Sequence, residues 1–266
     1  GFDSYASLHQ WSIDNPGDFW SRAWDDNQVI GTKGSTNYVQ GADFISSKFF
    51  PDARLNVAEN LLAHGDANEV AIVSILETGV RSEITWAELR IKVAATAAAM
   101  RAEGVVAGDR VVAWVPNVTE TIIYGLGALS IGAVVSTASP DFAPHAVEDR
   151  FGQVEPKVFL AADGYNYNGK YFDCSEKSAE IEKLLPTLKK TVRISEFDTW
   201  IAPFMGAEAV FEQLPFDHPG FVLFSSGTTG KPKCITHTGA GVMLKAQSEL
   251  LYQFNISKGN KVFFFT

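Results

Sequence analysis

One run of residues near the end of the chain has the clearest chemistry, and it reads Phe-Ser-Ser-Gly-Thr-Thr-Gly-Lys-Pro-Lys between Phe224 and Lys233. It contains four hydroxyl side chains, two glycines and two lysines, and it follows the apolar segment 221–224. Glycine lets backbone N–H groups approach an anion closely, and consecutive N–H groups in such a turn form an anion-binding concavity. Hydroxyl donors and a mobile ammonium group add to it. The run therefore predicts a loop that binds a polyphosphate.

This run differs from a Walker loop, which requires the pattern G-x-x-x-x-G-K-[ST]. Gly227 stands only three residues before Gly230, so the spacing is too short. A second stretch, from Gly164 to Lys170, has the Walker spacing but continues into Tyr171, where Ser or Thr is needed to hold magnesium. We reject that second stretch as a phosphate loop. The composition of the first run would also suit a polar surface turn, but the order of its residues is more specific and favours phosphate.

Alternating strands and helices must position this loop. Segments 70–76 and 81–85 are typical of a β-hairpin, and Thr85 with Glu88 forms a capping box for a helix that ends at Gly104. The other predicted strands are 110–115, 133–137, 157–162, 192–194, 221–224, a strand at Ile235, and 262–265. The other predicted helices are 117–131, 144–153, 175–185 and 239–254. Such alternation predicts an α/β fold with a mostly parallel sheet.

The first 62 residues are different, because they are rich in aromatic side chains and lack this alternation. A first apolar set recurs at near-helical spacing, and a second apolar face follows Pro16. The first set is Phe2, Tyr5, Leu8 and Trp11. Aromatic stripes of this kind usually serve packing rather than binding. We therefore predict a helical arm that packs on the main domain, with residues 31–48 as a surface loop.

The composition limits the classes of partner. The chain has 266 residues, of which 46% are hydrophobic, so it has ample material for a globular core. Its formal net charge is −9, which argues against nucleic acid and anionic membranes as partners but not against an anionic ligand held by a local turn. The most apolar predicted helix, 121–133, is too short to span a membrane. We therefore expect no membrane span.

The two cysteines, Cys174 and Cys234, lie far apart in the sequence. Their spacing fits neither a disulfide framework nor a metal site, so we predict no metal ligands. Cys234 stands in an apolar run and is predicted to be a small buried thiol. Reduced thiols and the absence of a signal peptide suggest a cytoplasmic protein, although a segment could have been removed before Gly1.

The loop resembles the phosphate-loop signature of the adenylate-forming superfamily, which includes acyl-CoA synthetases, luciferases and the adenylation domains of peptide synthetases. In that signature the position of Lys231 varies, whereas the Pro–Lys pair recurs. The resemblance therefore implies that Lys233, rather than Lys231, contacts phosphate. The residues implied to bind the phosphates of ATP, together with Mg²⁺, are Ser225, Ser226, Gly227, Thr228, Thr229, Gly230 and Lys233.

The resemblance covers nearly the whole chain. Segments 84–89, 108–111 and 132–134 are similar to the superfamily, and segment 49–60 resembles the N-terminal extension of its acetyl- and acetoacetyl-CoA synthetase branch. Within that branch the acetoacetyl-CoA synthetases are the most similar group, on segments 139–142, 149–157, 167–170 and 214–219. The implied domains are the extension, 1–62, and the first part of the AMP-binding domain, 63–266. An apolar strand is a poor domain boundary, so the chain resembles a fragment that is incomplete at its C-terminus.

The resemblance implies an acid–CoA ligase. A carboxylate would attack the α-phosphorus of ATP to give an acyl adenylate and pyrophosphate, and the thiol of coenzyme A would then displace AMP. The implied substrates are ATP, coenzyme A and a short-chain keto acid, acetoacetate. Lys170 is implied to contact the 3′-phosphate of coenzyme A, but it would equally suit a solvated surface position. The catalytic residues are expected beyond Thr266, in a missing C-terminal part of the chain.

Other interpretations stay open. The enzyme could use acetate, propionate or another short acid, or the chain could be a truncated nucleotide-binding protein without activity. His237 could serve as a base or metal ligand, but a hydrogen-bonded residue near a strand end is the simpler interpretation, and His218 is typical of a turn. Asp141 and Asp149 suit helix caps or surface charges.

Overall fold

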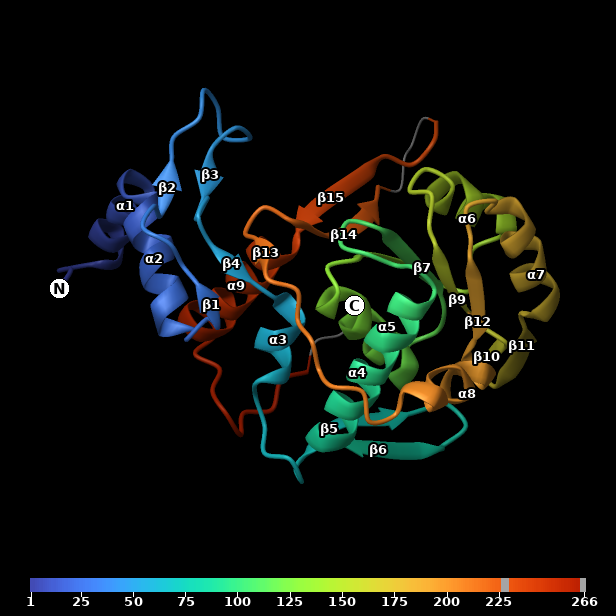
Figure 1. Cartoon of the computed structure of the whole chain (residues 1–266). Coiled ribbons are helices and arrows are strands. Elements are labelled where there is room, and N and C mark those ends of the chain that lie inside the picture. Colours follow the sequence, from blue (N-terminus) through green and yellow to red (C-terminus); the bar gives the residue numbers. More distant parts are fainter. Residues whose placement is uncertain (226–229, 264–266) are drawn as a thin grey trace. The chain divides into compact units, whose positions relative to one another are not determined.

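The computed structural model describes residues 1–225 and 230–263 (Figure 1). The chain forms two compact units, each built from segments that are distant in the sequence. The first unit contains Gly1–Leu55, Gln213–Asp217 and Thr238–Thr266, and the second contains Asn56–Glu212 and His218–His237. The phosphate loop predicted from the sequence belongs to the second unit.

A six-stranded sheet lies at the centre of the second unit, in the strand order β12–β9–β7–β8–β14–β15. The pairs β12/β9, β9/β7, β7/β8 and β8/β14 are all parallel. The strands are β7 (Arg110–Trp114), β8 (Val134–Ala138), β9 (Val158–Ala161), β12 (Lys190–Arg193), β14 (Pro219–Phe224) and β15 (Cys234–Thr238). The predicted α/β fold with a mostly parallel sheet is confirmed.

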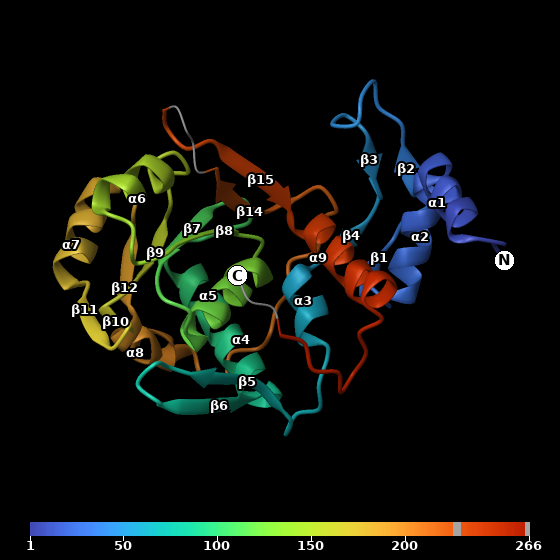
Figure 2. The same cartoon turned by 180° about the vertical axis from the view of Figure 1, so that it is seen from behind.

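Helices cover both faces of this sheet, because successive side chains of a strand point to opposite faces. In β7, Val111 and Ala113 belong to one buried cluster, whereas Val112 and Trp114 belong to another. The first cluster includes residues of α3 (Val57–Leu62), α4 (Trp86–Ala102), α5 (Thr119–Ser130) and α8 (Phe197–Ile201). The second includes residues of α6 (Pro144–Phe151) and α7 (Ser175–Leu184) (Figures 1 and 2). Strands without a polar face therefore stay buried between two helical layers.

The predicted capping box is present at the start of α4. The Thr85 hydroxyl accepts from the N–H of Glu88 at 3.2 Å, and the Glu88 carboxylate accepts from the N–H of Thr85 at 2.7 Å. The predicted hairpin that precedes α4 is also present, formed by β5 (Val70–Ile75) and β6 (Arg81–Thr85). Short 3₁₀ helices at Ile194–Glu196 and Ala202–Phe204 flank α8. Local sequence signals thus specify this part of the chain well.

Asn56 joins three distant stretches of the second unit, and its side chain is fully buried. Its amide nitrogen donates to the carbonyl oxygens of Leu129 at 3.0 Å, Ser130 at 3.1 Å and Glu212 at 2.9 Å. Its amide oxygen accepts from the N–H of Glu59 at 3.2 Å and so caps α3. A buried amide with all its groups bonded fixes the packing of the segments that it joins.

The first unit combines short strands with three helices. The helices are α1 (Tyr5–Asp14), α2 (Pro16–Asp26) and α9 (Gly239–Ser248), and a π-helical turn, Glu249–Gln253, follows α9. β1 (Gly31–Thr32), β4 (Arg54–Leu55) and β13 (Leu214–Pro215) form a small antiparallel sheet, and β2 (Tyr38–Val39) pairs with β3 (Lys48–Phe49). Trp24, Phe50 and Phe216 form an aromatic core, with ring centroids 5.0–6.4 Å apart.

Several details differ from the sequence predictions. The two predicted N-terminal helices are confirmed, but residues 31–48 contain the strands β1 and β2 rather than only a loop. The α-helix that begins at Gly239 ends at Ser248 instead of residue 254. The predicted strand 262–265 is wrong for Val262 and Phe263, which are 64% and 87% exposed and lie in no strand, while residues 264 and 265 lie outside the described residues. An apolar stretch becomes a strand only where a neighbouring strand takes its hydrogen bonds.

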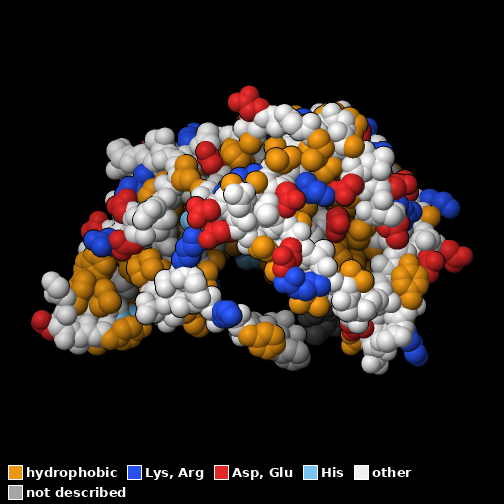
Figure 3. All heavy atoms as spheres, turned by 90° about the horizontal axis from the view of Figure 1, so that it is seen from below, with side chains coloured by type: hydrophobic (Ala, Val, Ile, Leu, Met, Phe, Trp, Pro, Cys, Tyr) orange, Lys and Arg blue, Asp and Glu red, His pale blue; other side chains and the backbone are white. Residues whose placement is uncertain are grey.

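Two further observations concern the surface. None of the helices within the described ranges is long and apolar enough to cross a bilayer. On the face drawn in Figure 3, acidic and basic side chains are interspersed, and no extended basic patch lies on that face.

Candidate functional site

The predicted phosphate loop connects the last two strands of the six-stranded sheet. β14 ends at Phe224 and β15 begins at Cys234, so the loop follows the carboxyl end of a strand that is parallel to β8. Ligands of α/β sheets usually bind at that edge. Four of the predicted phosphate-binding residues lie outside the described residues, namely Ser226, Gly227, Thr228 and Thr229. The geometry of the site therefore rests on Ser225, Gly230 and Lys233.

Ser225 and Lys233 close the base of the loop. The N–H of Ser225 donates to the carbonyl oxygen of Lys233 at 3.1 Å, and the N–H of Lys233 donates to the hydroxyl of Ser225 at 3.2 Å. The two ends of the loop are thus held together by these hydrogen bonds. The hydroxyl of Ser225 is used within this closure, although it keeps a further donor for a ligand.

The two lysines of the loop differ in their surroundings. The ammonium group of Lys231 lies 3.9 Å from the carboxylate of Asp149, and both side chains are largely exposed. The exposed side chain of Lys233 makes no hydrogen bond or ion pair with any residue in the described ranges. An ammonium group without a carboxylate partner can bind a phosphate without first breaking an ion pair. This difference favours Lys233, which the sequence also favoured.

Gly230 has a φ of +106°, in a region that side chains with a Cβ adopt only with strain. A Cβ at this position would meet no atom within 4 Å, so the glycine is required by its backbone conformation and not by lack of space. Glycines with positive φ allow successive N–H groups to converge on one anion. The backbone of Gly230 is therefore compatible with such a turn.

Asp149 of α6 and Gln153, just after the end of α6, contact the exit of the loop. Asp149 pairs with Lys231, and the side chain of Gln153 donates to the carbonyl oxygen of Pro232 at 2.9 Å. The sequence suggests only a cap or surface charge for Asp149 and no role for Gln153. Both lie about 80 positions before the loop, so no local pattern could indicate that they meet it.

Cys234 corrects another prediction, because its thiol is exposed instead of buried. It lies on β15, the end strand in the order of the described sheet, whose first three residues are exposed. Apolar neighbours in the sequence therefore did not imply burial. Cys174, which precedes α7, is buried, and burial raises the pKa of its thiol.

Lys170 lies on a hairpin formed by β10 (Gly164–Tyr167) and β11 (Lys170–Asp173), which are labelled in Figure 1. Asn168 and Gly169 form its two-residue turn, with φ of 51° and 72°. Positive φ at both positions is typical of a type I′ turn. The Walker-like spacing from Gly164 to Lys170 thus belongs to a hairpin, which confirms that it is no phosphate loop.

The ionisable residues suggest no metal centre. His218 bonds to the carbonyl oxygen of Gly132 at 2.8 Å and so acts as a hydrogen-bonded structural residue. Over residues 1–225 and 230–263, no three side chains of His, Cys, Asp or Glu come close enough to hold a metal ion together. His237 belongs to no such group.

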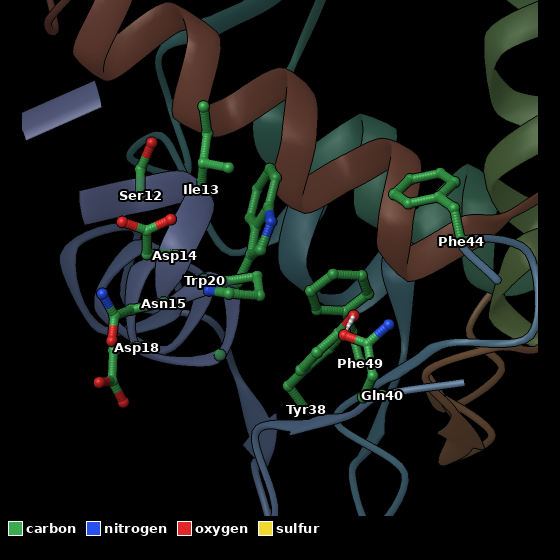
Figure 4. A pocket seen from close by; sticks show the side chains of 12 residues that line it. Ser12, Ile13, Asp14, Asn15, Asp18, Trp20, Tyr38, Gln40, Phe44 and Phe49 are labelled. Carbon is green, nitrogen blue, oxygen red and sulfur yellow. Dashed lines mark hydrogen bonds between the residues drawn. The ribbon is translucent and has the colours of Figure 1, made fainter. Parts of the chain in front are cut away.

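The first unit contains a pocket of about 600 Å³ between the α1–α2 junction and the β2–β3 hairpin (Figure 4). Trp20, Tyr38 and Phe49 line one side, and Asp14 and Asp18 lie at the other. No Lys, Arg or His is among its lining residues, so it has no cation to neutralise a phosphate. We therefore assign the nucleotide to the loop of the second unit and not to this pocket.

Comparison with known families and proteins supports a nucleotide-binding role for this chain. Residues 62–265 match the family model of AMP-binding enzymes, and residues 5–61 match the acetyl-coenzyme A synthetase N-terminus. The chain is 41% identical to acetoacetyl-coenzyme A synthetase of Rhizobium meliloti (strain 1021), over 100% of the chain and 43% of that protein. It is 32% identical to a malonamoyl-CoA synthetase of Penicillium aethiopicum, over 99% of the chain and 40% of that protein.

A solved structure is also similar. The acetoacetyl-CoA synthetase from Streptomyces lividans superposes with a TM-score of 0.90 at 35% sequence identity, covering 97% of this chain and 42% of that one. The chain thus spans less than half the length of the relatives it matches.

Proposed function

Because the chain belongs to the AMP-binding enzyme family, we propose that it is part of an ATP-dependent acid–CoA ligase. The proposed reaction converts acetoacetate, ATP and coenzyme A into acetoacetyl-CoA, AMP and pyrophosphate through an acyl adenylate. The full-length relatives named as acetoacetyl-CoA synthetases support this choice of acid. We further propose that residues 1–62 form an N-terminal extension and residues 63–266 the first part of the adenylation domain.

The observation that carries the proposal is the closed loop between β14 and β15. Ser225 and Lys233 hold its base through two hydrogen bonds, and Gly230 has the positive φ that an anion-binding turn needs. A loop of this composition, at the carboxyl edge of a parallel sheet and with an unpaired lysine at its end, suits the phosphates of ATP. We propose Ser225–Gly230 and Lys233 as the residues that hold them.

In the proposed reaction these residues form no covalent bond with the substrates, and they act by positioning them and by neutralising charge. In the first step a carboxylate oxygen bonds to the α-phosphorus, and the bond from that phosphorus to the bridging oxygen of pyrophosphate breaks. Lys233 and the loop N–H groups neutralise the β- and γ-phosphates, which leave as pyrophosphate. In the second step the thiol of coenzyme A attacks the acyl carbon and AMP leaves. Groups that bind the acid and complete catalysis are expected beyond Thr266.

Mg²⁺ fits this proposal as a companion of ATP. Protein sites for Mg²⁺ commonly use one or two carboxylates together with substrate phosphates and waters. The described residues hold no ready cluster of ligands, so the ion would be bound mainly through the phosphates next to the loop hydroxyls. There it would neutralise the charge of the departing pyrophosphate.

Lys170 is the proposed contact of the 3′-phosphate of coenzyme A. Its hairpin is fixed by a tight type I′ turn, and the side chain projects from an exposed strand, β11. Tyr167, which is 64% exposed, is its cross-strand partner on β10. An exposed cation next to an aromatic ring suits a nucleotide with a terminal phosphate.

A second candidate differs only in the acid. The similarity to a malonamoyl-CoA synthetase shows that relatives of comparable coverage are named for another acid. None of the residues proposed here to bind ATP or coenzyme A would contact the acyl group and select the acid. Another short-chain acid, such as acetate or propionate, is therefore the alternative substrate.

The experiment is to measure pyrophosphate release by the full-length gene product with ATP, Mg²⁺ and a panel of acids. We expect release with acetoacetate to exceed release with acetate, propionate and malonamate, and acyl-CoA to form when coenzyme A is added. Faster release with one of the other acids would replace acetoacetate as the substrate. ATP binding without release on any acid would favour a nucleotide-binding protein without ligase activity.

A further inference from the structure

The side chain of Gln153 makes three hydrogen bonds although the residue is exposed. It follows the end of α6, and its amide nitrogen donates to the carbonyl oxygens of Asp149 at 2.5 Å and Pro232 at 2.9 Å. Its amide oxygen lies 3.6 Å from the thiol of Cys234, which donates to it. Both ends of the amide are therefore engaged, and two of the three bonds reach the residues on either side of Lys233.

The contact with Pro232 has a specific effect on the backbone. Proline has no N–H, so its carbonyl oxygen is the only backbone group through which that residue can be held. The same peptide plane continues into the N–H of Lys233, which donates to the hydroxyl of Ser225. Gln153 thus holds one side of the Pro232–Lys233 peptide, and Ser225 holds the other.

A peptide plane that is held on both sides has little freedom to rotate, and its orientation sets the direction of the next side chain. The next side chain is that of Lys233. The carbonyl oxygen of Lys233 also accepts from the N–H of Ser225 at 3.1 Å, so both backbone groups of this lysine are bonded, while its ammonium group pairs with none of the described residues.

We propose that Gln153 is a positioning residue for ATP, acting through the Pro232–Lys233 peptide to aim the ammonium group of Lys233 at the phosphates. This proposal rests on the proposed function of the loop. It assigns Gln153 no contact with substrate.

The position of Gln153 separates this role from a structural one. Its side chain belongs to neither buried cluster of the second unit, and its residue is exposed. Substitution of an exposed residue usually changes stability by less than about 0.5 kcal/mol, which corresponds to roughly a twofold change in the unfolding equilibrium. A change in ATP binding that is much larger than the change in stability would therefore point to the loop.

The test uses Gln153→Leu and Gln153→Glu in the full-length protein, because both remove the donor to Pro232 and Glu also keeps the length of the side chain. We expect the KM and the Kd for ATP to rise roughly five- to tenfold in each variant, the size of one lost hydrogen bond, with the KM for the acid unchanged. The control is Gln10→Leu on α1, whose amide bonds only Asp14 of its own helix. It should match the parent protein in both constants.

A double-mutant cycle tests the route through Lys233. In a Lys233→Ala background, Gln153→Leu should add less than about a twofold rise in the KM for ATP, because coupled residues are not additive. A full rise in that background, or no rise in the parent background while Lys233→Ala is defective, would overturn the role of Gln153. If Lys233→Ala itself leaves the KM and turnover unchanged, the proposed function of the loop fails instead.

Discussion

The hydroxyl of Tyr165 donates to the carboxylate of Asp141 at 2.7 Å, which ties the β10–β11 hairpin to the segment that leads from β8 into α6. This hydrogen bond, followed by burial, raises the pKa of Tyr165 from its ordinary value near 10 to about 12. A raised pKa means that the folded protein binds this proton more tightly than the unfolded chain does. The contribution to stability is therefore fully present below about pH 10 and is lost as the pH rises toward about 12.

Asp141→Asn should consequently shift the titration of Tyr165 back toward pH 10, since the neutral amide no longer stabilises the protonated phenol by charge. The measurement is the tyrosinate absorbance as a function of pH, with Tyr165→Phe subtracted to isolate this residue. A Tyr165 signal that already titrates near pH 10 in the parent protein would contradict the role given to Asp141.

Lys233→Ala should reduce acid-dependent pyrophosphate release by the full-length protein roughly 10- to 100-fold, because a hydrogen bond to a charged group contributes about 1.5–3 kcal/mol. Lys231→Ala is the matched control. Its exposed pair with Asp149 should matter little, so the loss should stay below about threefold. Equal losses in the two variants would mean that the two lysines share the phosphate.

Asn56→Ala should lower the free energy of unfolding by about 3 kcal/mol, because it leaves buried carbonyl oxygens without their donor. The oxygens belong to Leu129, Ser130 and Glu212. Urea titration followed by tryptophan fluorescence provides the measurement. Asn68→Ala, at an exposed turn, serves as the control and should change stability by less than about 0.5 kcal/mol. Similar losses in both variants would show that the buried network adds nothing specific.

Cys234 should react with a thiol-specific reagent well before Cys174. Cys234 is exposed and lines a cavity of about 380 Å³, whereas Cys174 is buried with a raised pKa, which lowers its thiolate fraction. Mass spectrometry of the modified peptides would locate the label, and Cys234→Ser should remove the fast phase. Simultaneous modification of both thiols in the folded protein would argue against this difference.

Local patterns predicted the elements of the second unit because their signals lie within a few residues of one another. Thr85 and Glu88 cap α4 as expected, and the alternation of strands and helices led to the correct fold class. The order of the strands had no such signal. No local signal showed either which segments form the first unit. Its aromatic core brings together Trp24 and Phe216, which are far apart in the sequence.

For the candidate site, the sequence predicted the loop and its residue types but not their supports. Asp149 and Gln153 reach the loop only because α6 folds onto the sheet, and one sequence does not show which distant residues meet. Cys234 was misjudged for a related reason. Its apolar neighbours favour a strand, but exposure depends on whether another strand or helix covers β15.

The divided first unit has a consequence for synthesis on the ribosome. Trp24 and Phe50 leave the exit tunnel early, yet Phe216 and α9, which belong to the same unit, follow only after the whole of 56–212 has been made. At translation rates of roughly 5–20 residues per second, the delay is on the order of ten seconds or more. The strands β7, β8, β9 and β12 can therefore pair before Phe216 is available, and until then the early aromatic residues lack part of their core.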